Sequence, residues 1–336
     1  MKLLRDFDLT ATTTFHVPAL TRWYGEFENI EQLCALLEDP RLQGLPRMCM
    51  GGGSNLLFVK PYEGIVIRPA SRDITLLGSD NETVSVKADA GVVWDDFVKF
   101  CVDNDLFGAE NLSYIPGEVG ASAVQNVGAY GVEAKDIISA VHVYDTTDRR
   151  QKVLDVTDCG YGYRDSMFKK FPSRYIVLDV TYRLSCKESY NLEYGPLKEL
   201  KEDADLSLRK VRERIINIRK SKLPDPEYMG SAGSFFKNPV ITLKHFNALK
   251  ERYADIPSYP AGQGMIKVPA GWLIERSGLK GVAVGGAQVY TRQCLVIVNT
   301  GNATADDVVA LYRHVQDTVS DKFDILLSPE VNIIGL

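Results

Sequence analysis

Residues 113–132 read SYIPGEVGASAVQNVGAYGV and contain four glycines within 15 positions, with Glu118 as the only charged side chain. Glycine permits positive φ and leaves no Cβ between the main chain and a ligand. The segment is too rich in glycine to predict a stable helix and too small in its side chains to build core. Pro116 fixes its approach, and Ser122, Gln125 and Asn126 supply directed donors and acceptors. A plain connector is the alternative, but the four glycines and the amides between them favour a cofactor groove.

Length and charge limit the classes of protein. A chain of 336 residues has room for two or three domains. Its net charge of -5 gives no general attraction to nucleic acid or to an anionic membrane surface. No apolar run approaches the roughly 18 residues of a membrane span, and the N-terminus MKLLRDFDLT lacks the apolar core of a signal peptide. We therefore expect no nucleic-acid partner and no membrane insertion.

Cysteine and histidine spacing predicts neither disulfides nor a metal site. The six cysteines are scattered and include no C-x-x-C pair, which is typical of reduced residues in a cytoplasmic protein. The four histidines lie far from metal-ligand spacing. We expect a cytoplasmic protein without a bound metal ion.

A second glycine-rich segment, GGGSN at residues 51–55, follows a predicted buried strand at residues 48–50. Free backbone N–H groups at such a tight turn suit a phosphate, so the segment is a candidate pyrophosphate loop. It does not match the G-x-G-x-x-G dinucleotide fingerprint, because residue 56 is leucine and no helix is predicted to follow. A hairpin turn remains the alternative.

Two further segments carry candidate site residues. In YGYRDS at residues 161–166, two tyrosines around a glycine form a compact loop that can aim Arg164, although an ion pair with Asp165 or another acid is the favoured explanation from these residues alone. A basic helix at residues 209–222 ends in KLPDP, which places Lys222 over a rigid loop where it can meet an anion. A solvated helix face is the alternative.

Residues 230–239, GSAGSFFKNP, predict a second ligand-sized loop. Ser234 lacks the glycines of a G-x-S-x-G motif, which argues against nucleophilic hydrolysis, but its hydroxyl can donate a proton to a basic acceptor. A local hydrogen bond is the alternative. Glu330 stands alone in an apolar terminal segment predicted to be a strand, and such a carboxylate invites a functional role or an arginine partner.

Periodicity predicts the remaining elements. Helices are expected at residues 30–37, 92–103, 242–250 and 270–279, with a further helix capped by Thr304 and Asp307. Strands are expected at residues 64–69, 83–88, 137–144, 175–184 and 294–298.

Together these segments resemble the UDP-N-acetylenolpyruvoylglucosamine reductase family (MurB). The resemblance covers nearly the whole chain and rests on GGGSN at 51–55, IPGEVGASAVQNVGAYG at 115–131, GYRDS at 162–166, KLPDP at 222–226, GSAGSFFKNP at 230–239, AGWLIE at 270–275 and PEV at 329–331. It extends to the longer form of the family, which keeps a tyrosine-bearing loop, here at Tyr259.

The resemblance implies an α+β fold in which two subdomains of the vanillyl-alcohol-oxidase/PCMH type hold FAD and a C-terminal α+β domain binds substrate. The implied boundaries are 1–70, 71–205 and 206–336, with the last strand returning to the active site. FAD would bind non-covalently and NADPH would be the co-substrate. The implied reaction, in peptidoglycan precursor synthesis, reduces UDP-N-acetylglucosamine enolpyruvate to UDP-N-acetylmuramate. No obligatory protein partner is evident.

The resemblance also implies residue roles. Arg164 would stabilise negative charge beside the substrate carboxylate, Ser234 would donate the proton, and Glu330 would polarise the intermediate, for which burial must raise its pKa. The implied UDP-sugar contacts are Tyr194, Lys222, Asn238, Tyr259 and Gln293. The implied FAD contacts are Gly51, Gly52, Gly53, Ser54, Asn55, Pro116, Gly117, Gly120, Ser122, Gln125, Asn126, Gly128 and Tyr130.

One position departs from a common family form, because Ala121 replaces a hydroxyl residue before Ser122 and thereby removes a possible FAD phosphate contact. Two alternatives stay open: an FAD-dependent oxidase on the same scaffold with another substrate, and a flavin- or nucleotide-binding module without catalysis.

Overall fold

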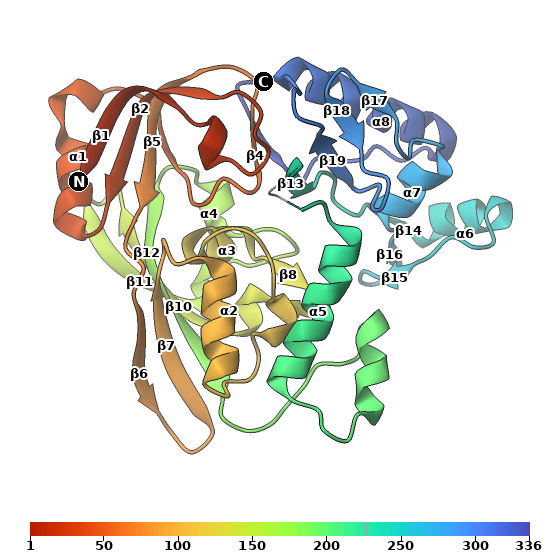
Figure 1. Cartoon of the computed structure of the whole chain (residues 1–336), viewed down its shortest axis with the longest axis horizontal. Helices are drawn as coiled ribbons and strands as arrows, with labels where there is room; N and C mark the ends of the chain where they lie inside the picture. The colour runs from red at the N-terminus through yellow and green to blue at the C-terminus, as the bar shows by residue number, and fades with distance from the viewer. Residues whose placement is uncertain (226–227) are drawn as a thin grey trace. The chain divides into compact units, whose positions relative to one another are not determined.

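The chain forms two compact units, each assembled from separate stretches of sequence. Unit 1 comprises Met1–Phe7, Thr21–Gly53 and Glu63–Arg219, and unit 2 comprises Asp8–Leu20, Ser54–Tyr62 and Lys220–Leu336. The computed structural model describes residues 1–225 and 228–336 (Figure 1). The division into domains 1–70, 71–205 and 206–336 stays a prediction.

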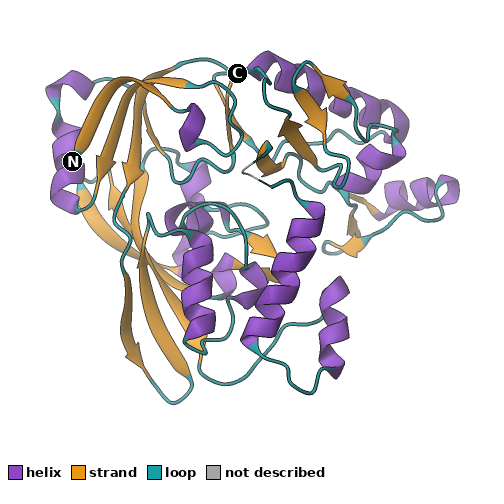
Figure 2. Cartoon of the chain, in the orientation of Figure 1, coloured by secondary structure: helices purple, strands orange, loops and turns teal. Residues whose placement is uncertain are grey.

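The two larger sheets of unit 1 have four and five strands (Figure 2). The first has the order β1-β2-β5-β3, with β1 (Lys2–Asp8), β2 (Leu20–Phe27), β5 (Tyr62–Pro69) and β3 (Arg47–Cys49). The second has the order β11-β10-β12-β7-β6, with β11 (Arg150–Asp155), β10 (Ile138–Asp145), β12 (Tyr175–Ser185), β7 (Thr83–Asp89) and β6 (Ile74–Ser79). Helix α1 (Ile30–Glu38) covers the first sheet through Leu33, Leu36 and Leu37, which are buried with Ile65 and Ile67 of β5.

Helices α2 (Trp94–Asp103) and α3 (Val119–Gln125) pack on the second sheet (Figure 1). Trp94, Phe97 and Cys101 recur at spacings of three and four residues, so they share one helix face and are buried with Tyr182 of β12. The short helix α4 (Met167–Lys170) and the pair β8 (Gly128–Ala129) and β9 (Val132–Glu133) complete this region. Helix α5 (Leu208–Lys222) buries Val211, Ile215 and Ile218 in a smaller apolar cluster.

Unit 2 is built around a third sheet of order β13-β19-β18-β17, with β13 (Gly230–Ser234), β19 (Val296–Asn299), β18 (Ala287–Val289) and β17 (Ala283–Val284). Its core is completed by α6 (Leu243–Arg252), α7 (Ala270–Arg276) and α8 (Ala305–Phe323). A small sheet joins β14 (Val240–Thr242), β16 (Met265–Lys267) and β15 (Tyr259–Pro260), and β4 (Leu56–Phe58) pairs in parallel with β20 (Asn332–Ile334).

Most elements expected from periodicity are confirmed within one or two residues, among them α1, α2, β5, β7, β10, β12 and α8. The capping box at Thr304 and Asp307 is also confirmed, since each side chain accepts the other residue's backbone N–H. Of the helices in the described residues, none combines the length and the apolar composition that crossing a membrane requires.

Two expectations about small-residue segments are wrong. Residues 119–125 form helix α3, although the sequence predicted no stable helix there. Tertiary contacts override the poor propensity: the amides of Val119 and Gly120 donate to the carbonyls of Val92 and Ala90, and Asn126 ends the helix in a left-handed conformation (φ 46°). Residues 230–234, expected in a loop, form strand β13, because their backbone pairs with β19.

Two further expectations concern segment ends. Glu330 was expected inside the terminal strand, but that strand, β20, begins at Asn332, because only from there does the backbone pair with β4. The glycine segment at 51–55 is not a hairpin turn of the described chain. It connects β3, which is parallel to β5, with β4, which is parallel to β20.

Candidate active site

In unit 1 the two glycine-rich segments pack against each other. A Cβ added to Gly51 would lie 3.2 Å from the Ala121 Cβ, and one added to Gly52 would lie 3.5 Å from the Gly117 Cα. Gly53 (φ 61°) and Gly117 (φ 121°) adopt backbone conformations that favour glycine. The two segments that the sequence assigned to a cofactor therefore meet in one place.

A buried carboxylate lies beneath this contact. Glu118 is only 3% exposed, and its Oε1 accepts a hydrogen bond of 2.6 Å from Arg68. Its Oε2 is buried with no hydrogen-bond partner among the described residues and would lie 3.1 Å from a Cβ at Gly51. Burial raises the pKa of Glu118, while Arg68 opposes the shift. Because the carboxylate lies beside Gly51, even a Cβ at this position would press against it.

The glycine segment fits a phosphate-bearing cofactor. Within the part of the chain that the structure describes, the amides of Gly51, Gly52 and Gly53 donate no hydrogen bond. Consecutive N–H groups on a backbone without side chains form an anion-binding concavity. These residues fit the pyrophosphate of FAD. Ser54 and Asn55, the other residues of the segment, belong to unit 2.

Helix α3 serves as a support more than as a source of ligand groups. Ser122 is 3% exposed and donates its hydroxyl to the Val119 carbonyl at 2.7 Å. Asn126 is fully buried: its Nδ2 donates to the Gly162 carbonyl (2.9 Å) and to Glu133 (3.1 Å), and its Oδ1 accepts from the Lys135 amide (3.0 Å). Both polar side chains are therefore engaged within the protein, whereas Gln125 is partly exposed.

Asn126 also connects the glycine-rich segment to the loop that carries Arg164. This loop is closed by reciprocal backbone hydrogen bonds between Gly162 and Asp165, and Arg164 adopts a left-handed conformation (φ 53°). The Arg164 guanidinium donates to the carbonyls of Gly128 (2.7 Å) and Asn126 (3.3 Å). The Asp165 carboxylate lies 3.5 Å from the Lys170 ammonium. Backbone carbonyls of the predicted cofactor segment thus direct the guanidinium.

Arg219 is a candidate site residue that the sequence did not single out. Its Nε donates to the Tyr114 carbonyl at 2.9 Å. Burial lowers the pKa of Arg219, and the positive charge of Arg164 adds to this effect. Burial raises the pKa of Tyr130, which the charge and hydrogen bond of Arg219 oppose. In the sequence Arg219 is one of several basic residues on α5, so no local signal separated it from the solvated ones.

In unit 2, Ser234, Glu330 and Asn55 lie on adjacent segments. Ser234 ends β13; the Glu330 amide donates to the Phe235 carbonyl at 2.8 Å, and the Asn55 Nδ2 donates to the Glu330 carbonyl at 3.1 Å. The Ser234 hydroxyl makes no hydrogen bond within residues 1–225 and 228–336, so the local bond considered as an alternative is not seen there. Three segments that are far apart in sequence are thus hydrogen-bonded to one another within unit 2.

The predicted UDP-sugar contacts vary in environment. The Asn238 Oδ1 accepts from the Ala270 amide (2.9 Å), and the Gln293 Oε1 accepts from the Leu295 amide (3.2 Å), which leaves the NH₂ ends to donate. Lys222 at the end of α5, Tyr194 and Tyr259 are exposed.

Pro226, the last residue of the KLPDP motif, lies outside the described residues. Arg164, Tyr130 and Tyr194 belong to unit 1, and Ser234, Glu330, Asn238 and Gln293 to unit 2.

Comparison with known proteins finds the same family along the whole chain. Residues 225–334 match the model of the UDP-N-acetylenolpyruvoylglucosamine reductase C-terminal domain, and residues 24–153 match that of an FAD binding domain. UDP-N-acetylenolpyruvoylglucosamine reductase of Bacteroides fragilis is 44% identical over 98% of this chain and 99% of its own length. That of Porphyromonas gingivalis is 43% identical over 99% of this chain and 100% of its own.

A solved structure agrees with these matches. The crystal structure of the reductase (MurB) from Thermus caldophilus superposes with a TM-score of 0.68 and 26% identity, covering 99% of this chain and 98% of that one. The match to an FAD binding domain coincides with the region that contains both glycine-rich segments and Glu118.

Proposed function

The chain belongs to the UDP-N-acetylenolpyruvoylglucosamine reductase family, and we propose that it reduces UDP-N-acetylglucosamine enolpyruvate to UDP-N-acetylmuramate with NADPH and bound FAD. The observation that carries this proposal is the packing of Gly51 and Gly52 on residues 117–121, in the segment whose carbonyls at Asn126 and Gly128 accept hydrogen bonds from Arg164. The enzyme would thus act in peptidoglycan precursor synthesis. A cytoplasmic location is part of the proposal and is supported by six cysteines that are all free thiols.

Arg164 would bind the substrate carboxylate. FAD, when bound, supplies hydride transfer to the β-carbon of the enolpyruvyl group. Negative charge then develops at the α-carbon and spreads into the carboxylate, where a guanidinium fork offers two parallel N–H donors and a fixed positive charge. The carbonyls of Gly128 and Asn126 orient the guanidinium before the negative charge develops on the substrate. Preorganised donors of this kind usually supply the largest part of the rate enhancement.

Ser234 would donate the proton that completes the reduction. Its Oγ–H bond breaks as a C–H bond forms at the α-carbon, so hydride and proton together saturate the double bond. A hydroxyl is a weak acid, but an enol-like carbanion is basic enough to take its proton. Glu330, whose backbone is tied to Phe235 and Asn55, would act on the same intermediate as a hydrogen-bonding group.

The UDP-sugar would be held by donors from several elements. The free NH₂ ends of Asn238 and Gln293 suit phosphate or carbonyl oxygens, because their own oxygens are already engaged by backbone amides. Lys222, Tyr194 and Tyr259 suit the diphosphate, which is anionic at any working pH. Beyond FAD, NADPH and the sugar nucleotide, the proposal requires no protein or nucleic-acid partner.

The visible absorption spectrum of the purified protein tests the proposal. We expect a flavin spectrum that NADPH bleaches and that UDP-N-acetylglucosamine enolpyruvate restores under anaerobic conditions, whereas UDP-N-acetylglucosamine does not. Restoration by oxygen but not by the enolpyruvyl compound would favour an oxidase. Absence of bound or bindable flavin would favour a nucleotide-binding module.

Arg164→Lys tests the carboxylate role in the same assay. It keeps the charge but loses the fork, so we expect FAD binding and NADPH-driven bleaching to persist while reoxidation by substrate slows on the order of 10²-fold. Arg183→Lys, at an exposed arginine of β12 hydrogen-bonded to Thr83, is the matched control and should react at the wild-type rate. Wild-type reoxidation in Arg164→Lys would refute bidentate binding.

A further inference from the structure

One fully buried side chain of unit 1 joins the segment that carries Tyr130 to the segment that carries Asn191 and Tyr194. Asn111 is 0% exposed and lies in the short 3-10 helix Glu110–Leu112. Its Nδ2 donates to the Tyr130 carbonyl at 2.9 Å and to the Asn191 carbonyl at 2.8 Å. Because carbonyl oxygens only accept, the amide must present its nitrogen to both. A single NH₂ group thus bridges segments that are 19 and 80 residues away.

Both hydrogen bonds of the Asn111 side chain are donated by its NH₂ group. The Asn111 Oδ1 is buried and has no hydrogen-bond partner among the described residues. Such an oxygen is costly to bury. An apolar side chain of similar volume would avoid that cost, so the two donated hydrogen bonds are the physical reason for asparagine here.

The bridged backbone needs this support. Tyr130 (φ 49°) and Gly131 (φ 83°) are consecutive left-handed residues, and a non-glycine residue persists in that conformation only where its surroundings hold it. The Asn191 Nδ2 adds a second tie to the Gly131 carbonyl at 3.4 Å. The tether therefore fixes a strained turn in the segment that is proposed to contact FAD.

The same tether sets the contact between two aromatic rings. Tyr130 and Tyr194 pack edge to face, with ring centroids 5.7 Å apart and an interplanar angle of 89°. A Cβ at Gly131 would lie 3.9 Å from the Tyr194 Cβ, which shows how closely the two backbones approach. Tyr194 is exposed, and its ring packs against that of Tyr130.

We propose that Asn111 is a positioning residue for the reaction: it places Tyr130 of the cofactor segment and Tyr194 of the substrate contacts relative to each other. This inference rests on the proposed function, in which these tyrosines contact FAD and the UDP-sugar. Asn111 itself touches neither ligand, because no part of its side chain reaches the surface.

Asn111→Leu tests this role, since it keeps the volume and removes both donors. We expect KM for the enolpyruvyl sugar nucleotide to rise about tenfold per FAD-containing molecule, while the rate of flavin reduction by NADPH changes less than about threefold. Asn299→Leu is the matched control. Asn299 is also a buried asparagine whose Nδ2 donates to two carbonyls, those of Phe15 and His16, but it lies in unit 2 and outside the proposed contacts.

A double-mutant cycle separates positioning from general destabilisation. If Asn111 acts through Tyr194, Asn111→Leu should change KM less than about twofold in a Tyr194→Ala background. An equal rise in both backgrounds, an equal rise in Asn299→Leu, or no rise at all would overturn the inference. If Asn111→Leu does not fold, Asn111→Ser, which keeps one donor on a shorter side chain, gives the same comparison.

FAD affinity supplies a readout that does not need the substrate. Loss of the Tyr130 tether should weaken FAD binding about tenfold in Asn111→Leu and leave it unchanged in Asn299→Leu. A wild-type chain that binds FAD but never reduces the sugar nucleotide would refute the proposed function, and the FAD comparison would still decide the role of Asn111. Equal FAD affinity in the wild type and Asn111→Leu would count against it.

Discussion

Ser234 is held in place by its backbone, whereas its side chain makes no hydrogen bond within the described residues. It pairs with Val296 across the sheet, and the next residue, Phe235, donates to the Leu295 carbonyl and accepts from the Glu330 amide, each at 2.8 Å. A hydroxyl mounted on a fixed strand end loses little conformational freedom when it meets a ligand. This arrangement suits a proton donor better than a structural serine.

Ser234→Ala should therefore leave FAD binding and NADPH-driven bleaching intact while slowing reoxidation by the sugar nucleotide by about 10²- to 10⁴-fold, the range for loss of a general acid. Anaerobic stopped-flow absorbance measures both half-reactions. Ser231→Ala, in the same strand, removes a hydroxyl without this role and should behave as the wild type. Unimpaired reoxidation in Ser234→Ala would falsify the proton-donor assignment.

At the scale of elements, helix α3 shows how a glycine sets the distance between a helix and the backbone beneath it. A Cβ at Gly120 would lie 2.8 Å from the Ala90 Cβ, closer than real Cβ contacts allow, and 3.3 Å from the Ala90 carbonyl oxygen. Glycine at this position lets the first turn of the helix bond directly to the Ala90 carbonyl at 2.9 Å. The position of α3 in turn sets residues 117–121, on which Gly51 and Gly52 pack.

Gly120→Ala should consequently lift α3 away from Ala90. We expect a loss of about 1–3 kcal/mol in the free energy of unfolding, as for other overpacked sites, together with weaker FAD binding. Chemical denaturation and fluorescence titration of the apoprotein with FAD measure the two effects. Gly78→Ala in β6, where an added Cβ meets nothing within 4 Å, is the control and should change neither. Wild-type FAD affinity in Gly120→Ala would show that FAD binding does not depend on the distance between α3 and Ala90.

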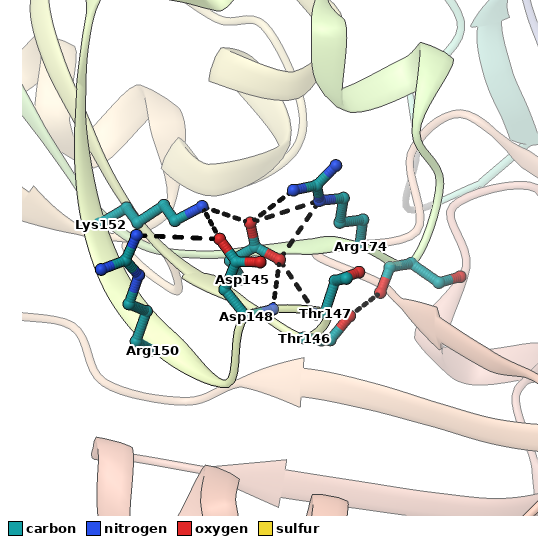
Figure 3. A network of polar contacts seen from close by, with 8 residues as sticks. Asp145, Thr146, Thr147, Asp148, Arg150, Lys152 and Arg174 are labelled. Carbon is teal, nitrogen blue, oxygen red and sulfur yellow. Dashed lines mark hydrogen bonds and ion pairs between the residues drawn. The ribbon is translucent and has the colours of Figure 1, made fainter.

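At the scale of the whole molecule, one buried carboxylate organises a network at the edge of the second sheet of unit 1 (Figure 3). Asp145 is 0% exposed and accepts hydrogen bonds from Lys152 (2.7 Å), from Arg174 (3.0 Å) and from the amides of Thr147 (3.0 Å) and Asp148 (3.2 Å). The network thereby fastens the β10–β11 hairpin to the start of β12. Burial by itself would raise the pKa of Asp145, but these hydrogen bonds together lower it well below its ordinary value.

This shift predicts a pH-dependent contribution to stability. Because the folded-state pKa of Asp145 is depressed, its stabilisation is complete above the ordinary value of 3.8 and is lost as pH falls below it toward the folded-state pKa. Asp145→Asn should cost about 2 kcal/mol at pH 7, since it leaves two cations without their central partner, and the difference from the wild type should shrink below about pH 4.

Urea denaturation across pH 2–8 measures this difference. Asp148→Asn is the matched control: its carboxylate also bonds to Lys152 but is partly exposed, so its removal should have a much smaller effect. A constant difference between Asp145→Asn and the wild type at every pH would mean that the ionisation of Asp145 does not contribute.

Much of the fold and of the candidate site could be predicted from particular residues. The 3.6-residue spacing of Val93, Phe97, Phe100 and Cys101 predicted α2, and the alternation of Val84, Val86 and Ala88 predicted β7, because local periodicity follows directly from backbone geometry. For a similar reason, the glycine-rich segments predict where a cofactor would lie. A backbone that must approach another atom closely excludes Cβ at that residue, whatever surrounds it.

What the sequence by itself determined was therefore local: which segments are helices and strands, which lack side chains where a ligand would lie, and which family they resemble. Only the tertiary structure decided that a glycine-rich stretch forms α3, that carbonyls of Asn126 and Gly128 direct Arg164, and that Asn111 ties Tyr130 to Asn191. Each of these depends on contacts between residues distant in sequence. Such contacts override local propensity because the packing and hydrogen bonds they add outweigh the few tenths of a kcal/mol that separate one residue's preferences from another's.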